Sequence, residues 1–167
     1  MFKRVVRAIE HTAIITCALP NVARRQLLWR MIAFGRRLPQ QFDHSLPTMM
    51  ARLTPSRQIE TRRIEPDDVR RLADAVAAWQ LRSPLGICLR RSLLRYYFLR
   101  EADLPVGIVF GARFKDSSEG GGIGGHAWLT LNGEPYYENP QDYAGFVAMY
   151  TYPDSETNGS PSPPRSA

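Results

Sequence analysis

The chain has 167 residues, 44% of them hydrophobic, and a formal net charge of +6. This length and apolar content fit one globular domain with a buried core and exclude a fully disordered chain. Two cysteines are too few for a disulfide framework and suggest a reducing, cytoplasmic location, and no Cys/His cluster has the spacing of metal ligands. We therefore expect neither a metal nor a cofactor.

The charge is unevenly distributed along the chain. Residues 1–82 carry 15 Lys/Arg against 7 Asp/Glu, whereas residues 83–167 carry 7 against 9. A basic half is typical of proteins that meet an acidic partner, such as nucleic acid, a membrane surface or an acidic peptide. The alternative is an Arg-rich helix face that is merely solvated.

The first 82 residues are predicted to be helical. The chain opens with a basic start and a short apolar run from Thr12 to Leu19, in the sequence MFKRVVRAIEHTAIITCALPNVA. This pattern is weakly similar to a signal peptide. Glu10 and His11 interrupt the apolar character, and eight residues are too few to span a bilayer. We therefore predict an amphipathic helix here, and no membrane span.

Two further helices are predicted before residue 82. Apolar residues at helical spacing favour a helix over 22–38, and the Pro-punctuated residues 39–57 are predicted to be loop with short helical turns. Pro66 suits the first turn of a helix that extends to about Gln80, and Asp67 beside it favours a helix N-terminus.

The second half is predicted to mix one helix with several strands. The sequence Ser83-Pro84-Leu85-Gly86 breaks the chain, and a helix follows that carries Cys88 in its first turn. Asn132-Gly133 is the strongest short hairpin signal in the sequence. Residues 154–167 contain almost no apolar side chains and are predicted to be a disordered tail. The predicted strands cover residues 106–112, 126–131, 134–138 and 146–152.

A glycine-rich stretch, GGGIGG, precedes His126. It is not a phosphate-binding loop, because no Lys-Ser/Thr follows it and it does not open a helix. We expect residues 120–125 to form a flexible loop that is one wall of a substrate cleft. The alternative is a surface linker without a role.

The order of polar residues suggests nucleophilic catalysis. A thiol at a helix start, as predicted for Cys88, has a favourable environment for deprotonation, and His126 could act as its base and later as an acid. A hairpin leads to Glu138 and Asn139 and brings Glu138 near His126, where its carboxylate could orient the ring. The competing interpretations are that Cys88 is an inert buried thiol, as we expect for Cys17, and that Glu138 is a solvated strand end.

These residues carry a resemblance to a known family. Four short segments resemble the motifs of the transglutaminase-like leader peptidases of lasso-peptide maturation. They are Cys88 to Leu93 (CLRRSL), Val109 to Arg113, His126 to Trp128 and Asn132-Gly133. The resemblance is strong over residues 84–140 and is limited to a helical pattern over residues 1–82. It implies an α+β fold with a papain/transglutaminase-like cysteine protease core, in which a Cys-bearing helix packs on a small antiparallel sheet behind an N-terminal helical region.

The resemblance also implies a domain organisation, which we predict as a helical region over 1–82, a catalytic core over 83–153 and the tail. The implied activity is cleavage of the leader from a ribosomally synthesised precursor peptide, after which a separate cyclase closes the ring. Members of this family use a small leader-binding domain that begins with strands. Because the chain shows no such region, we expect a separate leader-recognition protein as partner.

The resemblance assigns roles by motif position. Cys88 becomes the nucleophile and His126 the base, and the family's third member, usually an Asp twelve residues after the His, falls at Glu138. Asn139 is the papain-like alternative. The oxyanion would be held by the backbone N–H of Cys88, with Gln80 as a candidate second donor.

Two other function classes stay open at this point. A transglutaminase-type acyl transferase would use the same residues but pass the acyl group to an amine instead of water. A non-catalytic binding protein would use its basic half to contact nucleic acid or an acidic partner, and its function would survive the loss of Cys88.

Overall fold

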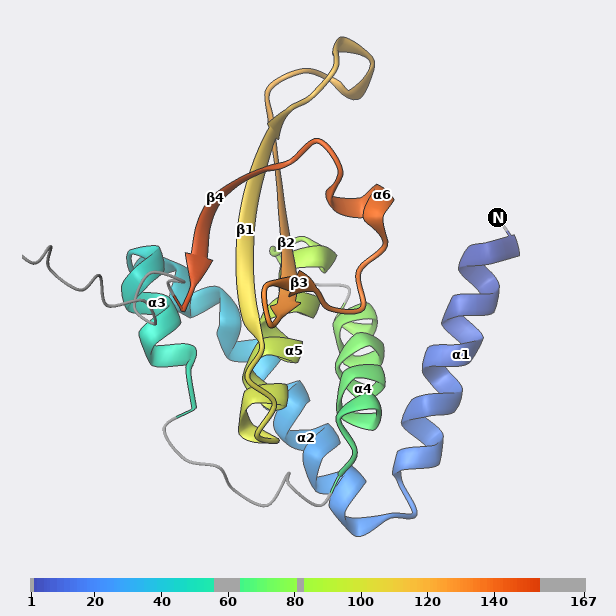
Figure 1. Ribbon diagram of the computed structural model, residues 1–167. Helices are drawn as coiled ribbons and strands as arrows, with labels where there is room; N and C mark the ends of the chain where they lie inside the picture. The colour runs from blue at the N-terminus through green and yellow to red at the C-terminus, as the bar shows by residue number, and fades with distance from the viewer. Residues whose placement is uncertain (1, 56–63, 81–82, 154–167) are drawn as a thin grey trace, which may run out of the picture.

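The computed structural model describes residues 2–55, 64–80 and 83–153 of the chain (Figure 1). The predicted tail over 154–167 lies outside the described residues. The described part is a mixed α+β fold with a small antiparallel four-stranded sheet, as the sequence predicted.

The predicted helices are confirmed, and local signals explain where they begin. The side chain of Asn21 accepts a hydrogen bond from the backbone N–H of Arg24 at 3.0 Å, which caps the second helix, and Pro66 occupies the first turn of the fourth. The region after residue 38 is more regular than the predicted loop, because it forms a 3₁₀ helix and a short α-helix. The helices are α1 (Phe2–Ala18), α2 (Val22–Arg37), η1 (Leu38–Asp43), α3 (Leu46–Leu53), α4 (Pro66–Trp79), α5 (Ile87–Glu101), η3 (Ser117–Glu119) and α6 (Pro140–Tyr143).

The sheet has the order β3-β2-β1-β4, with every neighbouring pair antiparallel. Its strands are β1 (Gly107–Phe114), β2 (Ile123–Leu131), β3 (Glu134–Pro135) and β4 (Val147–Tyr152). The hairpin between β2 and β3 turns at Asn132 and Gly133, which have φ of 54° and 85°, as a turn of the predicted kind requires.

Two strand boundaries differ from the prediction. β2 begins at Ile123, so His126 lies inside the strand and not at its start. β3 ends at Pro135, so Glu138 is not on a strand. Proline cannot donate a hydrogen bond to continue the ladder, and Tyr137 has a left-handed φ of 52°, which turns the chain away from the sheet.

Helix α5 forms the centre of the molecule. It lies behind the sheet and beside α4, while α1 packs on the far side of α4 (Figure 1). Its side chains are buried on several faces, and these include the charged Arg90, Arg95 and Glu101. A helix that is covered all round needs partners for each buried charge, and those partners position the site described below.

One hydrophobic core joins the described helices on both sides of residue 82. Its members include Met31 of α2, Val76 of α4, Leu99 of α5 and Leu129 of β2. The packing between the described helices that precede residue 81 and the elements that follow residue 82 is therefore continuous.

Candidate active site

Cys88 lies in the first turn of α5, as the sequence predicted. Gly86 is the N-cap, and Cys88 is half-buried. The first backbone N–H groups of a helix have no intrahelical partner, so they are available to an anion held beside the thiol. Cys17, by contrast, is exposed on α1.

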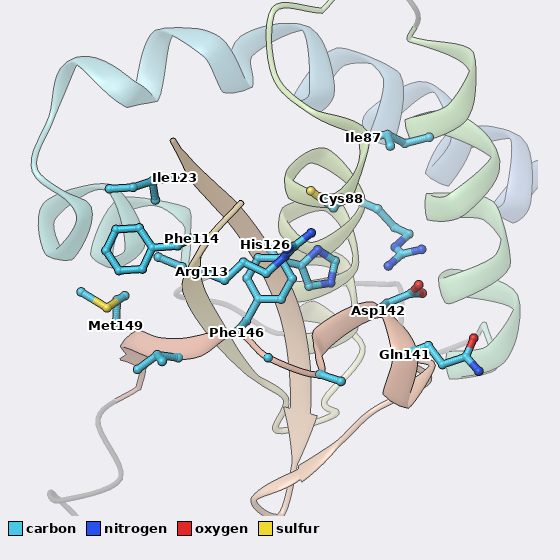
Figure 2. A pocket seen from close by; sticks show the side chains of 15 residues that line it. Ile87, Cys88, Arg113, Phe114, Ile123, His126, Gln141, Asp142, Phe146 and Met149 are labelled. Carbon is cyan, nitrogen blue, oxygen red and sulfur yellow. The ribbon is translucent and has the colours of Figure 1, made fainter. Parts of the chain in front are cut away.

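Cys88 and His126 line the same cavity, which has a volume of about 990 Å³ (Figure 2). The other lining residues come from α5, β1, β2, α6 and the start of β4, and Figure 2 shows the thiol and the imidazole within it. The chain thus brings together, from a helix start and a strand, the two groups that nucleophilic catalysis requires.

The ring of His126 is held between two aromatic side chains. It stacks on Trp128 at a centroid distance of 5.9 Å and lies 5.3 Å from the ring of Phe146. Gly111, which faces His126 across β1 and β2, leaves space for Trp128: a Cβ there would lie 2.7 Å from an atom of the indole ring. This packing fixes the plane of the imidazole before any substrate binds.

The electrostatic surroundings favour neutral His126. Burial and the nearby charge of Arg91 lower the pKa of His126, while the carboxylate of Asp142 opposes them. The buried Nε2 atom finds no hydrogen-bond partner in the described part of the chain. A neutral imidazole can accept the thiol proton, so this lowered pKa suits a general base.

A buried hydrogen bond connects the helix of Cys88 to the strand of His126. Ser92 lies one helical turn after Cys88 and on the same face, and its hydroxyl donates to the carbonyl oxygen of Ala127 at 2.7 Å. Because Ala127 follows His126 directly, this bond ties β2 to α5 close to the two candidate catalytic residues.

Glu138 is the centre of a buried ion-pair cluster. Its side chain is only 1% exposed; one carboxylate oxygen accepts from Arg91 at 2.8 Å and the other from Arg95 at 3.0 Å. Arg95 in turn holds Asp74 of α4 through two hydrogen bonds of 2.6 and 2.7 Å. Burial raises the pKa of Glu138, and the two arginines oppose that shift. Both carboxylate oxygens are thus engaged by arginine.

Asn139 and Gln80 have other partners as well. The side chain of Asn139 caps α6 by accepting from the backbone N–H of Gln141 at 3.1 Å. The side-chain amide of Gln80 donates to the carbonyl oxygen of Ile32 at 3.2 Å and lines a different cavity, between α1, α2 and α4. The structure does not bring Gln80 to the cavity that Cys88 lines.

Asp142 is an acidic residue that sequence reasoning missed. It lines the cavity with Cys88 and His126, and Figure 2 shows its carboxylate on the same side of the cavity as Gln141. The signal was present in the sequence: Asn139-Pro140 is a typical helix start, which places Asp142 in a first turn. The expectation that a strand continued to Glu138 concealed it.

The glycine-rich stretch contributes to the cavity through its one isoleucine. Ile123 lines the cavity, and Gly124 and Gly125 belong to β2. Gly120 to Gly122 all have positive φ between 66° and 89°, a conformation that side-chain-bearing residues rarely adopt.

The described residues hold neither a metal-binding cluster nor a membrane-spanning helix. They contain no group of three or more His, Cys, Asp or Glu side chains that could hold a metal ion. Nor is any helix in residues 2–55, 64–80 or 83–153 sufficiently long and apolar to cross a membrane.

A helix-borne thiol that shares a cavity with a strand-borne histidine on a small antiparallel sheet is consistent with a fold of the cysteine protease or acyltransferase type. The profile of the transglutaminase-like superfamily matches residues 28–151, about three quarters of the chain. The chain belongs to this superfamily, which generally contains cysteine-dependent enzymes. No curated protein and no solved structure gives a significant match.

Replacing Asp142 with Asn should lower the pKa of His126 below its wild-type value, because the substitution removes the charge that favours the imidazolium. NMR titration of the His126 ring protons measures this shift. Asp43→Asn is the matched control, since Asp43 lies in η1 and does not line the cavity. An unchanged His126 pKa in the Asp142 variant would contradict an electrostatic role for Asp142.

Proposed function

We propose that this protein is a cysteine peptidase that removes the leader from a ribosomally synthesised precursor peptide during lasso-peptide biosynthesis. The observation that carries the catalytic part is the shared cavity of Cys88 and His126. The precursor class is supported by the motif resemblance over residues 84–140, and superfamily membership is consistent with it.

In the proposed reaction the Cys88 thiolate attacks the scissile carbonyl carbon after His126 has taken the thiol proton. The oxyanion that forms is held by the backbone N–H of Cys88 at the positive end of α5. When the C–N bond breaks, His126 gives its proton to the leaving amine and a thioester remains on Cys88. Water then adds with His126 as base, which releases the leader as an acid and restores the thiol.

Three residues are candidates for the third catalytic group, which would act on His126. The sequence suggested Glu138 and Asn139, and the structure adds Asp142. Glu138 matches the family position, but its two oxygens are engaged by Arg91 and Arg95. Asn139 caps α6. Asp142 is the carboxylate that lines the cavity and acts electrostatically on His126, so we favour it as the group that stabilises the imidazolium.

The proposal includes two partner proteins. One is a separate recognition protein that presents the leader, and the other is a cyclase that closes the ring of the released core peptide. The basic residues 1–82 could dock the recognition protein or the leader. A cytoplasmic location belongs to the same proposal.

The proposed reaction can be tested on a precursor peptide of the lasso class together with its leader-recognition protein and a labelled primary amine. We expect mass spectrometry to find free leader acid and core peptide, with no amine in the leader product. Amide-linked label on the leader would show instead that the protein is an acyl transferase. An uncleaved precursor in the presence of the recognition protein would contradict both.

A further inference from the structure

One wall of the cavity that Cys88 lines is formed by large apolar side chains that are mostly exposed. Four such residues line the cavity: Phe114 (84% exposed), Ile123 (69%), Val147 (65%) and Met149 (70%). We call these four residues the apolar wall. Single exposed apolar residues are common on soluble proteins, but a contiguous group that borders a cavity marks a binding surface.

The sheet register explains why these side chains gather. Phe114 of β1 pairs with Ile123 of β2, and Ala112, two residues before Phe114 and on the same face, pairs with Val147 of β4. A register shift between Phe110 and Gly111 leaves an extra residue, Met149, in β4. Bulges of this kind redirect side chains and are common next to active sites.

The opposite side of the cavity carries polar side chains from α6, together with Ile87 of α5. Figure 2 shows Phe114, Ile123 and Met149 on one side of His126, with Gln141 and Asp142 on the other. A peptide that crosses the cavity would thus meet an apolar surface on one side of the reactive pair and a carboxylate on the other.

The charge of Asp142 indicates the direction of such a peptide. Bond cleavage creates a new amino group, which is protonated at neutral pH and is stabilised by a nearby carboxylate. An orientation with the leaving amine near Asp142 pairs that amine with the carboxylate, although Arg91 also lines the cavity, and it puts the acyl side of the scissile bond against the apolar wall.

We propose that the apolar wall is a specificity subsite for bulky aliphatic or aromatic side chains on the acyl side of the scissile bond. This inference rests on the proposed function, since it assigns the substrate preference of the same cavity. Such a side chain would cover apolar surface that the protein otherwise leaves in water, which favours binding of apolar over polar substrates.

Two peptidyl chloromethyl ketones of closely matched size test the subsite, acetyl-Leu-Leu and acetyl-Asn-Asn. In each reaction the thiolate sulfur forms a bond to the methylene carbon and chloride leaves, so the alkylated cysteine is found by peptide mass spectrometry. We expect the Leu-Leu reagent to alkylate Cys88 at least about tenfold faster than the Asn-Asn reagent. Cys17, an exposed thiol on α1, is an internal reference for which the two rates should be similar.

The substitutions Phe114→Thr and Ile123→Thr remove apolar surface and keep a residue that is compatible with a strand. Each should reduce the Leu-Leu to Asn-Asn rate ratio at Cys88, and the double variant should bring it near one. Val22→Thr, a matched change at an exposed site of α2 outside the cavity, should preserve the ratio.

The subsite is ruled out if the wild-type ratio at Cys88 is near one, or if the ratio persists in both single variants and the double variant. Alkylation by iodoacetamide tests the proposed function separately, because this small reagent has no side chain that could bind the apolar wall. If iodoacetamide labels Cys88 no faster than Cys17, the proposed nucleophile fails and the subsite with it. Fast iodoacetamide labelling without a Leu-Leu preference contradicts the subsite alone.

Discussion

Replacing Cys88 with alanine should lower the rate of leader cleavage by roughly four to six orders of magnitude. The variant has no atom that can form the thioester, and the oxyanion donor and His126 cannot replace a missing nucleophile. The cleavage rate is measured by mass spectrometry under single-turnover conditions, with the recognition protein present. Because Cys88 lies half-buried at a helix start, alanine should leave the fold intact, which thermal unfolding checks.

Cys17→Ala is the matched control, since it removes the other thiol of the chain from an exposed site. It should cleave at the wild-type rate. If Cys88→Ala retained full function instead, the protein would be a binding module. Its association with an acidic partner should then weaken steeply as salt increases, as expected of a basic surface.

Replacing Arg95 with methionine should reduce the free energy of unfolding by about 3–5 kcal/mol, the usual cost of removing one partner from a buried ion pair. Arg95 connects three elements, because it holds Asp74 of α4 and Glu138 of the segment after β3 while it is itself part of α5. Without the guanidinium, Asp74 and Glu138 lose their shared cation in a buried site. Chemical denaturation at pH 7 measures the loss.

The stability deficit of Arg95→Met should depend on pH. Burial raises the pKa of Glu138 and Arg95 opposes this, so the variant should raise that pKa further. Glu138 in the folded variant then binds a proton more readily than Glu138 in the unfolded chain. The difference in the free energy of unfolding between wild type and variant should therefore narrow as the pH falls from 7 toward 5. A deficit that is constant over this range would contradict the charge-based explanation.

Two further variants separate charge from geometry in the same cluster. Arg95→Lys keeps the positive charge but loses the planar fork that binds Asp74 through two hydrogen bonds, so its stability should fall between those of wild type and Arg95→Met. Glu138→Gln tests directly whether Glu138, at the family's position for the third catalytic group, acts on His126. If Glu138 belongs to the ion-pair cluster alone, this variant should lose stability while the pKa of His126 stays unchanged.

Much of the fold could be predicted because its signals are local. The periodic apolar residues of α2 and α4, Pro66 at a first turn and Asn132-Gly133 in a hairpin each act within a few residues. The limits of β3 were wrong because a proline and one left-handed residue at Tyr137 ended a strand that composition alone would extend. That error hid α6, and with it Asp142.

The sequence alone determined the placement and the order of the two candidate catalytic residues: a thiol in the first turn of a helix, then a histidine that precedes a hairpin. Their motif spacing also indicated the superfamily. Tertiary structure decided what the charged residues do. Arg91, Arg95 and Glu138 have the composition of a solvated surface, but they form a buried cluster because α5 is covered on several faces and each buried charge needs a partner. The apolar wall likewise depends on the register of three strands, and register is a property of the whole sheet that no single segment of sequence contains.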